Sequence, residues 1–136
     1  MLHDAYADIL ELADAMSVAI CVENTMNFHL PFVGRALDGL LRFDSLGLTW
    51  DAGHDARCGF REKPVFDRYP ERIKHMHLHD CDGQSDHRPL YAGIVPVDER
   101  LRLAEALGLT VVIEVKTGAA LRESVNRLRT RFAGGR

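Results

Sequence analysis

The sequence predicts an α/β fold in which helices cover a parallel sheet, and three observations lead to this class. Short apolar runs are each followed by a polar or glycine-containing loop and then by a segment with helical periodicity. This unit occurs four times, and no proline- or glycine-rich linker or low-complexity segment divides the units. Because strands that alternate with helices are joined by crossovers, we expect parallel strands in a single domain over residues 1–136.

The elements follow in order along the chain. A helix is expected first, over 2–15. Four strands are expected at 17–23, 45–51, 72–80 and 109–115. The helices after them are expected at 31–43, 64–73, 96–108 and 117–132, where apolar residues recur three and four positions apart. Pro31, Pro64 and Pro96 stand where a first helical turn tolerates proline. Gly108 follows the third of these helices, as a helix-ending residue does.

Composition and charge exclude several classes of protein. With 136 residues, of which 46% are hydrophobic and 27% charged, the chain can bury the core of an ordinary globular domain. A net charge of −3 supplies no basic field, which disfavours nucleic acid as a partner. Cys21, Cys58 and Cys81 are odd in number and form no CxxC pair, as is typical of a reducing compartment. No signal core or membrane-spanning apolar run is present, so we expect a cytoplasmic protein without membrane contact.

Acidic and histidine residues fall where each predicted strand ends. They are Glu23 in the first strand, Asp51 with His54 just after the second, His77 and His79 in the third, and Glu114 in the fourth. Ligands of parallel α/β folds bind at the carboxyl ends of the strands, so we expect these side chains to share one rim. Carboxylates and imidazole that converge there would bind a divalent cation, namely Mn²⁺, Mg²⁺, Co²⁺ or Zn²⁺.

The third predicted strand contains the stretch HMHLHD. Because alternate side chains of a strand share a face, His75, His77 and His79 lie on one side while Met76 and Leu78 lie on the other. One face is therefore apolar and the other carries polar chemistry. His75 lies deeper along the strand, where a hydrogen-bonded core residue is the alternative to a ligand.

Each candidate also has a structural interpretation. Glu23 could mark the point where its strand reaches solvent, and Asp51 could cap the tight turn that Gly53 allows. Glu114 is a lone acid in an apolar strand, where an unpaired charge is costly, so a cation or Lys116 must balance it. Four strand ends with matching chemistry favour the site over four separate coincidences.

Several motifs resemble a known family. WDAGH (50–54), HMHLHDCDG (75–83) and DHRPLYAGIV (86–95) resemble the D-T-G-H, H-x-H-x-x-D-x-x-G and H-x-P-L-G-x-G segments of the xylose isomerase-like TIM-barrel superfamily, which includes sugar-phosphate isomerases, epimerases and endonuclease IV. VENT (22–25) and VIEV (112–115) stand in the matching order. The resemblance implies a parallel (β/α) half-barrel, the second half of a TIM barrel, with the family's strands 5 to 8 and their helices.

The resemblance also implies a site. Its single-metal centre would be formed by Glu23, Asp51, His77 and Glu114. Glu23 and Glu114 would in addition act as an acid/base pair that moves a proton next to a carbonyl of a sugar or keto acid while the metal polarises the substrate oxygens. His54 would hold a substrate hydroxyl or a second metal, and we place His79 and Lys116 in the same group.

The loop of the third motif departs from the family pattern. Asp86 and His87 match the loop that supplies extra ligands in members with several metals, yet the family places one residue between that acid and the histidine. Tyr91 and Ala92 stand before Gly93, where the family has glycine directly after P-L. We therefore expect a loop of different shape.

The favoured function is a metal-dependent isomerase or epimerase. The alternatives are an endonuclease IV-like nuclease, which the −3 charge disfavours, and a non-catalytic remnant that binds metal or dimerises. A full barrel takes roughly 250 residues, and a half-barrel leaves two edges and an open inner face. We therefore expect a fragment that lacks the N-terminal half, since Met1 begins inside a family helix pattern, or a homodimer that closes a barrel.

Overall fold

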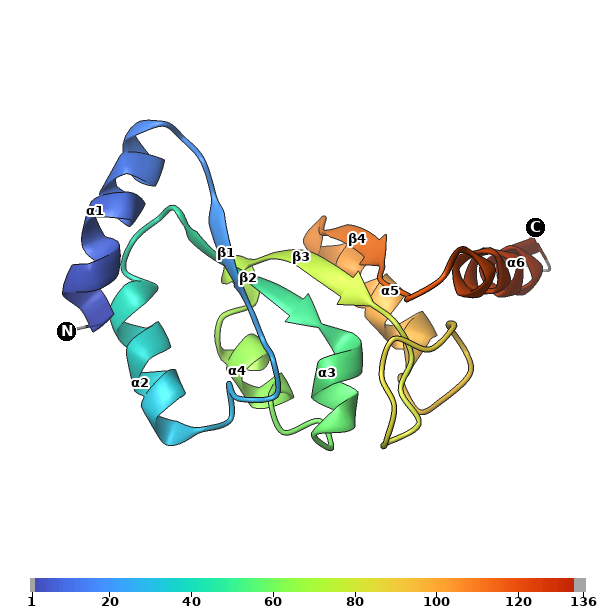
Figure 1. Cartoon of the computed structure of the whole chain (residues 1–136). Helices are drawn as coiled ribbons and strands as arrows, with labels where there is room; N and C mark the ends of the chain where they lie inside the picture. The colour runs from blue at the N-terminus through green and yellow to red at the C-terminus, as the bar shows by residue number, and fades with distance from the viewer. Residues whose placement is uncertain (1, 134–136) are drawn as a thin grey trace.

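The computed structural model of the chain describes residues 2–133, and its strands form one parallel sheet (Figure 1). They lie in chain order as β1 (Ile20–Glu23), β2 (Leu46–Asp51), β3 (Ile73–Leu78) and β4 (Thr110–Ile113). Each strand pairs in parallel with the next. The predicted α/β class with four strand–helix units is confirmed, and the arrangement is that of a partial TIM barrel. β1 begins three residues later than expected because the Val18 amide donates to the Ala13 carbonyl at the end of the first helix.

The helices deviate from expectation in the middle of the chain. They are α1 (Leu2–Ala15), α2 (Pro31–Leu40), α3 (Ala52–Arg57), α4 (Lys63–Arg68), the 3₁₀ turn η1 (Pro70–Arg72), α5 (Val97–Leu107) and α6 (Gly118–Ala133). The helix expected over 64–73 is divided because Tyr69 precedes Pro70, and proline disfavours a helical conformation in the residue before it. α3 was not expected. Among residues 2–133, no helix is long and apolar enough to cross a membrane.

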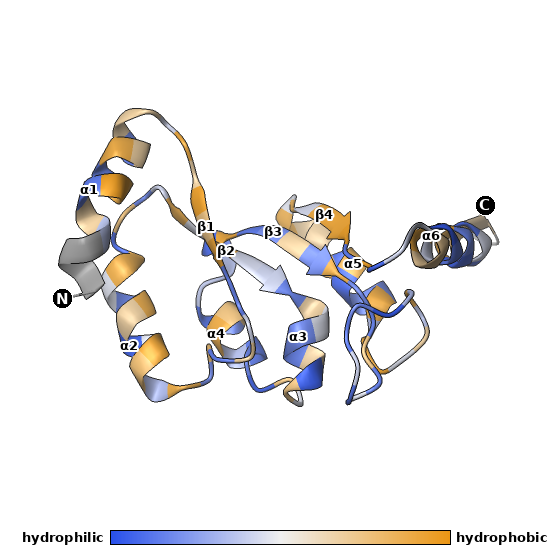
Figure 2. Ribbon diagram, viewed as in Figure 1, coloured by the Kyte–Doolittle hydropathy of each residue, from blue (hydrophilic) through white to orange (hydrophobic). Residues whose placement is uncertain are grey.

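The hydrophobic core lies on the outer face of the sheet, which the helices cover. Leu48, Met76 and Leu78 are fully buried there. Trp50 stacks on Phe66 of α4 with ring centroids 4.5 Å apart. Figure 2 shows hydrophobic and hydrophilic residues alternating along α1 and α2, as in helices that bury one side. The apolar side of the HMHLHD stretch thus packs into the core.

The inner face of the sheet is open. The register places Thr49 beside His75 and Asp51 beside His77 on this face. Val112, two residues before Glu114, is 45% exposed. β1 and β4 form the two edges. His75 is half-buried and bonds the Thr110 hydroxyl at 2.6 Å, so the expectation of a core position was wrong while that of a hydrogen bond is confirmed.

Candidate metal centre

Four side chains from four strand ends converge on the inner face, and we call them the inner centre: Glu23, Asp51, His77 and Glu114. One potential ligand atom from each lies within 4.8 Å of the others. In a flat sheet, the first and fourth strands would be on the order of 14 Å apart. The curvature of the sheet and the reach of the two glutamates therefore bring its edges to a common point. The Glu114 amide is held at this rim by the Leu78 carbonyl, at 3.1 Å.

The Nδ1 atom of His77 lies among the carboxylates of the inner centre. It is 3.0 Å from Glu114 Oε2, 3.4 Å from Glu23 Oε2 and 4.0 Å from Asp51 Oδ2. Asp51 is fully buried, whereas Glu23 and Glu114 are 32% and 41% exposed. The two glutamates can therefore be reached from the open inner face, and Asp51 cannot.

The inner centre fits a divalent cation. His77 Nδ1 and Glu114 Oε2 are buried atoms that form no hydrogen bond with any described residue. Buried polar atoms are almost always paired, and neighbouring carboxylates repel one another, so both features would be relieved by a cation. Three carboxylates and one imidazole form a ligand set typical of Mn²⁺, Mg²⁺, Co²⁺ or Zn²⁺. The role of these four residues as ligands stays a prediction.

Asp51 is held in place by three neighbours. Its Oδ1 accepts the His54 amide at 2.7 Å as the N-cap of α3, so the capping interpretation and the inner centre hold together. His79 Nε2 lies 2.9 Å from the same oxygen, and the Asp51 amide donates to Asn24 Oδ1 at 2.6 Å. Burial alone would raise the pKa of Asp51, but the hydrogen bonds and positive charge from His79 and His54 outweigh it and lower that pKa.

His79 is a fully buried partner of Asp51 that has no contact with solvent. Its Nδ1 accepts the His87 amide at 2.8 Å. Burial lowers its pKa, but Asp51 raises it by more, so the net pKa is raised. A Cβ atom on Gly53 would lie 2.0 Å from the His79 ring. A side chain at position 53 would thus collide with His79. The turn predicted at Gly53 is the first turn of α3, and it brings Asp51 and His54 together as expected.

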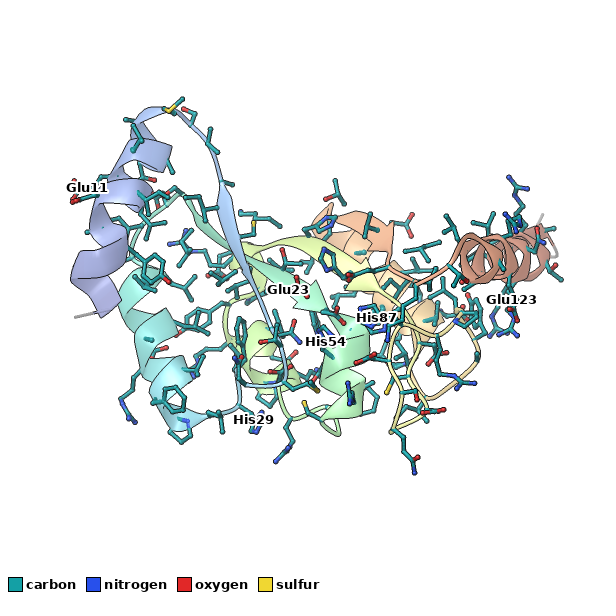
Figure 3. All side chains as sticks on the ribbon, in the orientation of Figure 1. Glu11, Glu23, His29, His54, His87 and Glu123 are labelled. Carbon is teal, nitrogen blue, oxygen red and sulfur yellow. The ribbon has the colours of Figure 1, made fainter. Side chains whose placement is uncertain are left out.

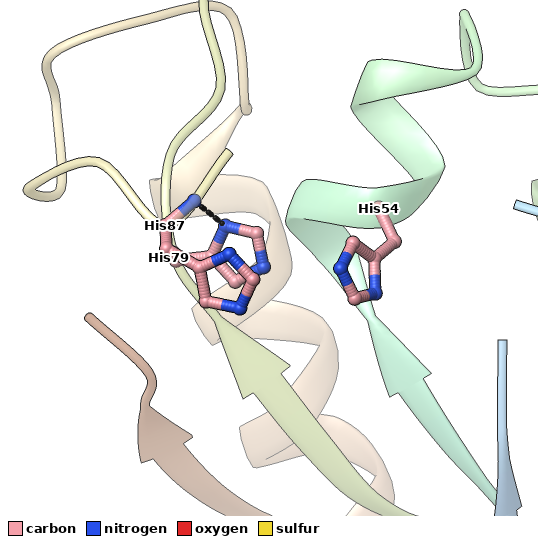
Figure 4. A group of neighbouring side chains, drawn as sticks. All are labelled: His54, His79 and His87. Carbon is pink, nitrogen blue, oxygen red and sulfur yellow. Dashed lines mark hydrogen bonds between the residues drawn. The ribbon is translucent and has the colours of Figure 1, made fainter. Parts of the chain in front are cut away.

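Three histidines, which Figure 4 draws together, contact carboxylates of the inner centre. The rings of His79 and His87 stack with centroids 4.1 Å apart, and His54 stands edge-on to both at 5.4 Å. His54 Nδ1 is 3.1 Å from Asp51 Oδ2, and His87 Nε2 is 3.6 Å from Glu114 Oε1. His54 and His87 thus contact the carboxylates of the inner centre from α3 and from the loop after β3.

Comparison with known proteins agrees with this architecture. A family model described as "Xylose isomerase-like TIM barrel" matches residues 1–131. The chain belongs to the xylose isomerase-like TIM-barrel family. No curated protein matches it. Among solved structures it is similar to the TTHB071 protein from Thermus thermophilus, soaked with ZnCl2, with 27% identity and a TM-score of 0.69 over 98% of this chain and 52% of that one.

A second solved structure shows the same fold at lower identity. It is the probable 3-DHS dehydratase AsbF involved in the petrobactin synthesis from Bacillus anthracis, with 17% identity and a TM-score of 0.72 over 94% of this chain and 54% of that one. The xylose isomerase-like chain thus spans about half the length of these two proteins.

The loop that departs from the family pattern forms an ion-pair cluster. Asp86 pairs with Arg57, with Lys116 at 3.3 Å and with His87 Nδ1 at 2.9 Å. The hydrogen bond to His87, followed by those to Arg57 and Lys116, holds the pKa of Asp86 well below its usual range despite partial burial. Lys116 therefore balances Asp86 rather than Glu114, so the alternative partner expected for Glu114 was wrong.

Two residues of the same loop have left-handed backbone conformations. Tyr91, which stands directly after P-L, has φ of 61°, and His87 has φ of 54°. Such left-handed conformations are strained for residues other than glycine. The Tyr91 hydroxyl donates to Asp98 Oδ1 at 2.7 Å, which fixes the ring against α5.

Sequence reasoning missed a buried network next to the inner centre. Asn24 bridges the ends of β1 and β2, because its Nδ2 donates both to the Asp51 carbonyl at 3.0 Å and to Glu62 Oε2 at 2.6 Å. Glu62 is fully buried. The signal for Asn24 was present in the VENT motif, directly after Glu23, whereas Glu62 lies in no motif.

Proposed function

We propose that this chain carries the metal-binding and proton-transfer residues of a sugar or keto acid isomerase or epimerase. The observation that carries the proposal is that two accessible glutamates flank one histidine nitrogen that has no hydrogen-bond partner within the described residues. The family match supports metal-dependent chemistry on this fold.

The residues of the inner centre divide the work according to their exposure. All four residues would hold the cation, with Asp51 as the fixed ligand because it is fully buried and bonded to His79, while Glu23 and Glu114 would in addition move protons. When bound, the cation would supply Lewis acidity that polarises a carbonyl oxygen. Glu23 and Glu114 approach from the two edges of the sheet, so one carboxylate oxygen could remove a proton from the carbon beside the carbonyl while the other returns a proton.

His54 is the polar group best placed to orient a substrate beside Glu23. Its Nδ1 lies 3.6 Å from Glu23 Oε1, and the side chain is 14% exposed. A substrate hydroxyl that reaches Glu23 would therefore meet this imidazole.

The test is proton exchange at the carbon beside a carbonyl. The full chain is loaded with Mn²⁺, and excess metal is removed. It is then incubated in D₂O with dihydroxyacetone, D-fructose and D-xylulose. Loss of the signal of the C–H beside the carbonyl is followed by ¹H NMR. We expect exchange that requires the metal and is abolished in Glu114→Gln. Glu11→Gln, an exposed glutamate on α1 (Figure 3), is the matched control and should exchange normally.

Two other results would overturn the proposal. Cleavage of a duplex that contains an abasic site, without exchange, would favour the nuclease alternative. Metal binding with neither activity would favour a non-catalytic remnant.

A further inference from the structure

Besides the inner centre and the three histidines next to it, the described residues contain one further group of potential metal ligands. It consists of His29 on the connection from β1 to α2, Cys58 at the end of α3, and Glu62 directly before α4. One atom from each lies within 4.8 Å of the others. Figure 3 shows His29 on its connection, apart from His87. Three segments thus bring an imidazole nitrogen, a thiol sulfur and a carboxylate oxygen together.

His29 has a nitrogen without a partner. Its Nδ1 is buried and forms no hydrogen bond with any residue in the described range. A buried ring nitrogen of this kind is normally satisfied by protein or by a bound species. The atom therefore indicates that something outside the chain pairs with it.

Glu62 is a buried carboxylate without a cationic partner. It is fully buried, and within residues 2–133 no salt bridge to it is found. The Asn24 side chain and the Phe28 amide donate to its two oxygens at 2.6 and 2.7 Å. A carboxylate has about four acceptor positions, so these bonds orient it and leave capacity for a further ligand. Charge burial of this kind is costly unless a cation compensates it.

Cys58 gives the group its chemical preference. Its thiol contacts only the Asp55 carbonyl, at 3.2 Å, among the hydrogen bonds of the described residues. A thiolate is a soft ligand that Mg²⁺ and Mn²⁺ do not favour, whereas Zn²⁺ binds Cys, His and Glu together. The inner centre contains no sulfur, so the two groups differ in the metal they prefer.

We propose that His29, Cys58 and Glu62 form a second, zinc-type cation site with one coordination position left for water. Binding would release the Cys58 thiol proton to solvent and pair the charge of Glu62. His29 also lines a cavity of about 350 Å³, which gives the metal a route from solvent. The bound ion would link the connection after β1 to α3 and α4, and through Glu62 and Asn24 it would brace the backbone of Asp51.

Co²⁺ is the probe, because thiolate-to-cobalt charge transfer gives a near-ultraviolet band that only a sulfur-containing site produces. The full chain is stripped of metal under reducing conditions and titrated with Co²⁺. We expect the band to grow until both sites are filled, by two equivalents of Co²⁺, and to be lost in Cys58→Ser. That variant should still bind one equivalent of Co²⁺ at the inner centre, without the band. Cys21→Ser, an exposed cysteine on β1, is the matched control and should keep the band.

Two further variants keep the outcome decisive. His29→Gln retains the thiol and should weaken the Co²⁺ affinity read from the band by at least about tenfold. Glu114→Gln should leave the band intact, which separates this site from the inner centre. A wild-type protein without the band, or a band that persists in Cys58→Ser, would overturn the proposal.

Discussion

The two faces of the sheet are built from the same strands and have opposite properties. On the outer face, Leu48 and Met76 are fully buried against hydrophobic neighbours. On the inner face, His77 Nδ1 and Glu114 Oε2 lie 3.0 Å apart, yet each is a buried atom without a hydrogen bond among the described residues. Hydrophobic neighbours within the chain satisfy the outer face, whereas the buried polar atoms of the inner face would be satisfied by a bound cation. Fold stability and cation binding should therefore respond to different substitutions.

The largest expected effect comes from the outer face. Leu48→Ala should lower the free energy of unfolding by about 2–5 kcal/mol, because it removes buried methyl groups and leaves a cavity. Urea denaturation with EDTA present measures the loss. The Mn²⁺ affinity of the folded variant should be unchanged. A folded variant with weakened Mn²⁺ binding would show that the two faces are coupled.

Gly53→Ala should lower both the free energy of unfolding and the Mn²⁺ affinity. The new methyl group would meet the His79 ring, which must move and release Asp51. Overpacking of this kind costs about 1–3 kcal/mol of unfolding free energy, and Mn²⁺ affinity should fall with it. The control is Gly34→Ala in α2, where an added Cβ would meet no atom within 4 Å. This substitution should stabilise the helix, because alanine loses less conformational freedom on folding than glycine. Equal behaviour of the two variants would refute the role assigned to Gly53.

His54→Ala should weaken metal binding at the inner centre without lowering the stability of the fold. Its imidazole contacts Asp51 and Glu23, and loss of such a supporting partner lowers metal affinity by about 10- to 100-fold. The unfolding free energy measured with EDTA should stay near that of wild type, because the backbone amide of residue 54 still donates to Asp51. A large loss of stability without metal would give His54 a structural role instead.

The smallest expected effect is a pH dependence of folding stability that arises from Tyr91, in the loop after β3. Burial, and then the hydrogen bond to Asp98 and its charge, raise the pKa of Tyr91 to about 12. An unfolded chain releases this proton near pH 10, so between about pH 10 and 12 the folded state binds more protons. Stability should therefore fall as pH rises through that window, and Tyr91→Phe should make the fall shallower. An identical fall in both proteins would contradict the assignment.

The periodicity of the sequence was sufficient to predict the sheet and most helices. α3 escaped prediction because it has only six residues and contains Gly53, so it shows too little periodicity to be seen. The convergence of the four inner-centre side chains could be predicted because each lies at the carboxyl end of its strand. The pairing of Lys116 with Asp86, and the network of Asn24 and Glu62, depend on loops whose path no local pattern encodes. His29, Cys58 and Glu62 come from three such connections.

The central claim is that the inner centre binds a divalent cation, and Mn²⁺ affinity measures it most directly. Free and bound Mn²⁺ are distinguished by electron paramagnetic resonance for wild type, Glu23→Gln, Glu114→Gln and the Glu11→Gln control. We predict binding in wild type and in Glu11→Gln, and affinities at least about tenfold weaker in the other two. Mn²⁺ affinities that are equal in all four proteins would contradict the claim.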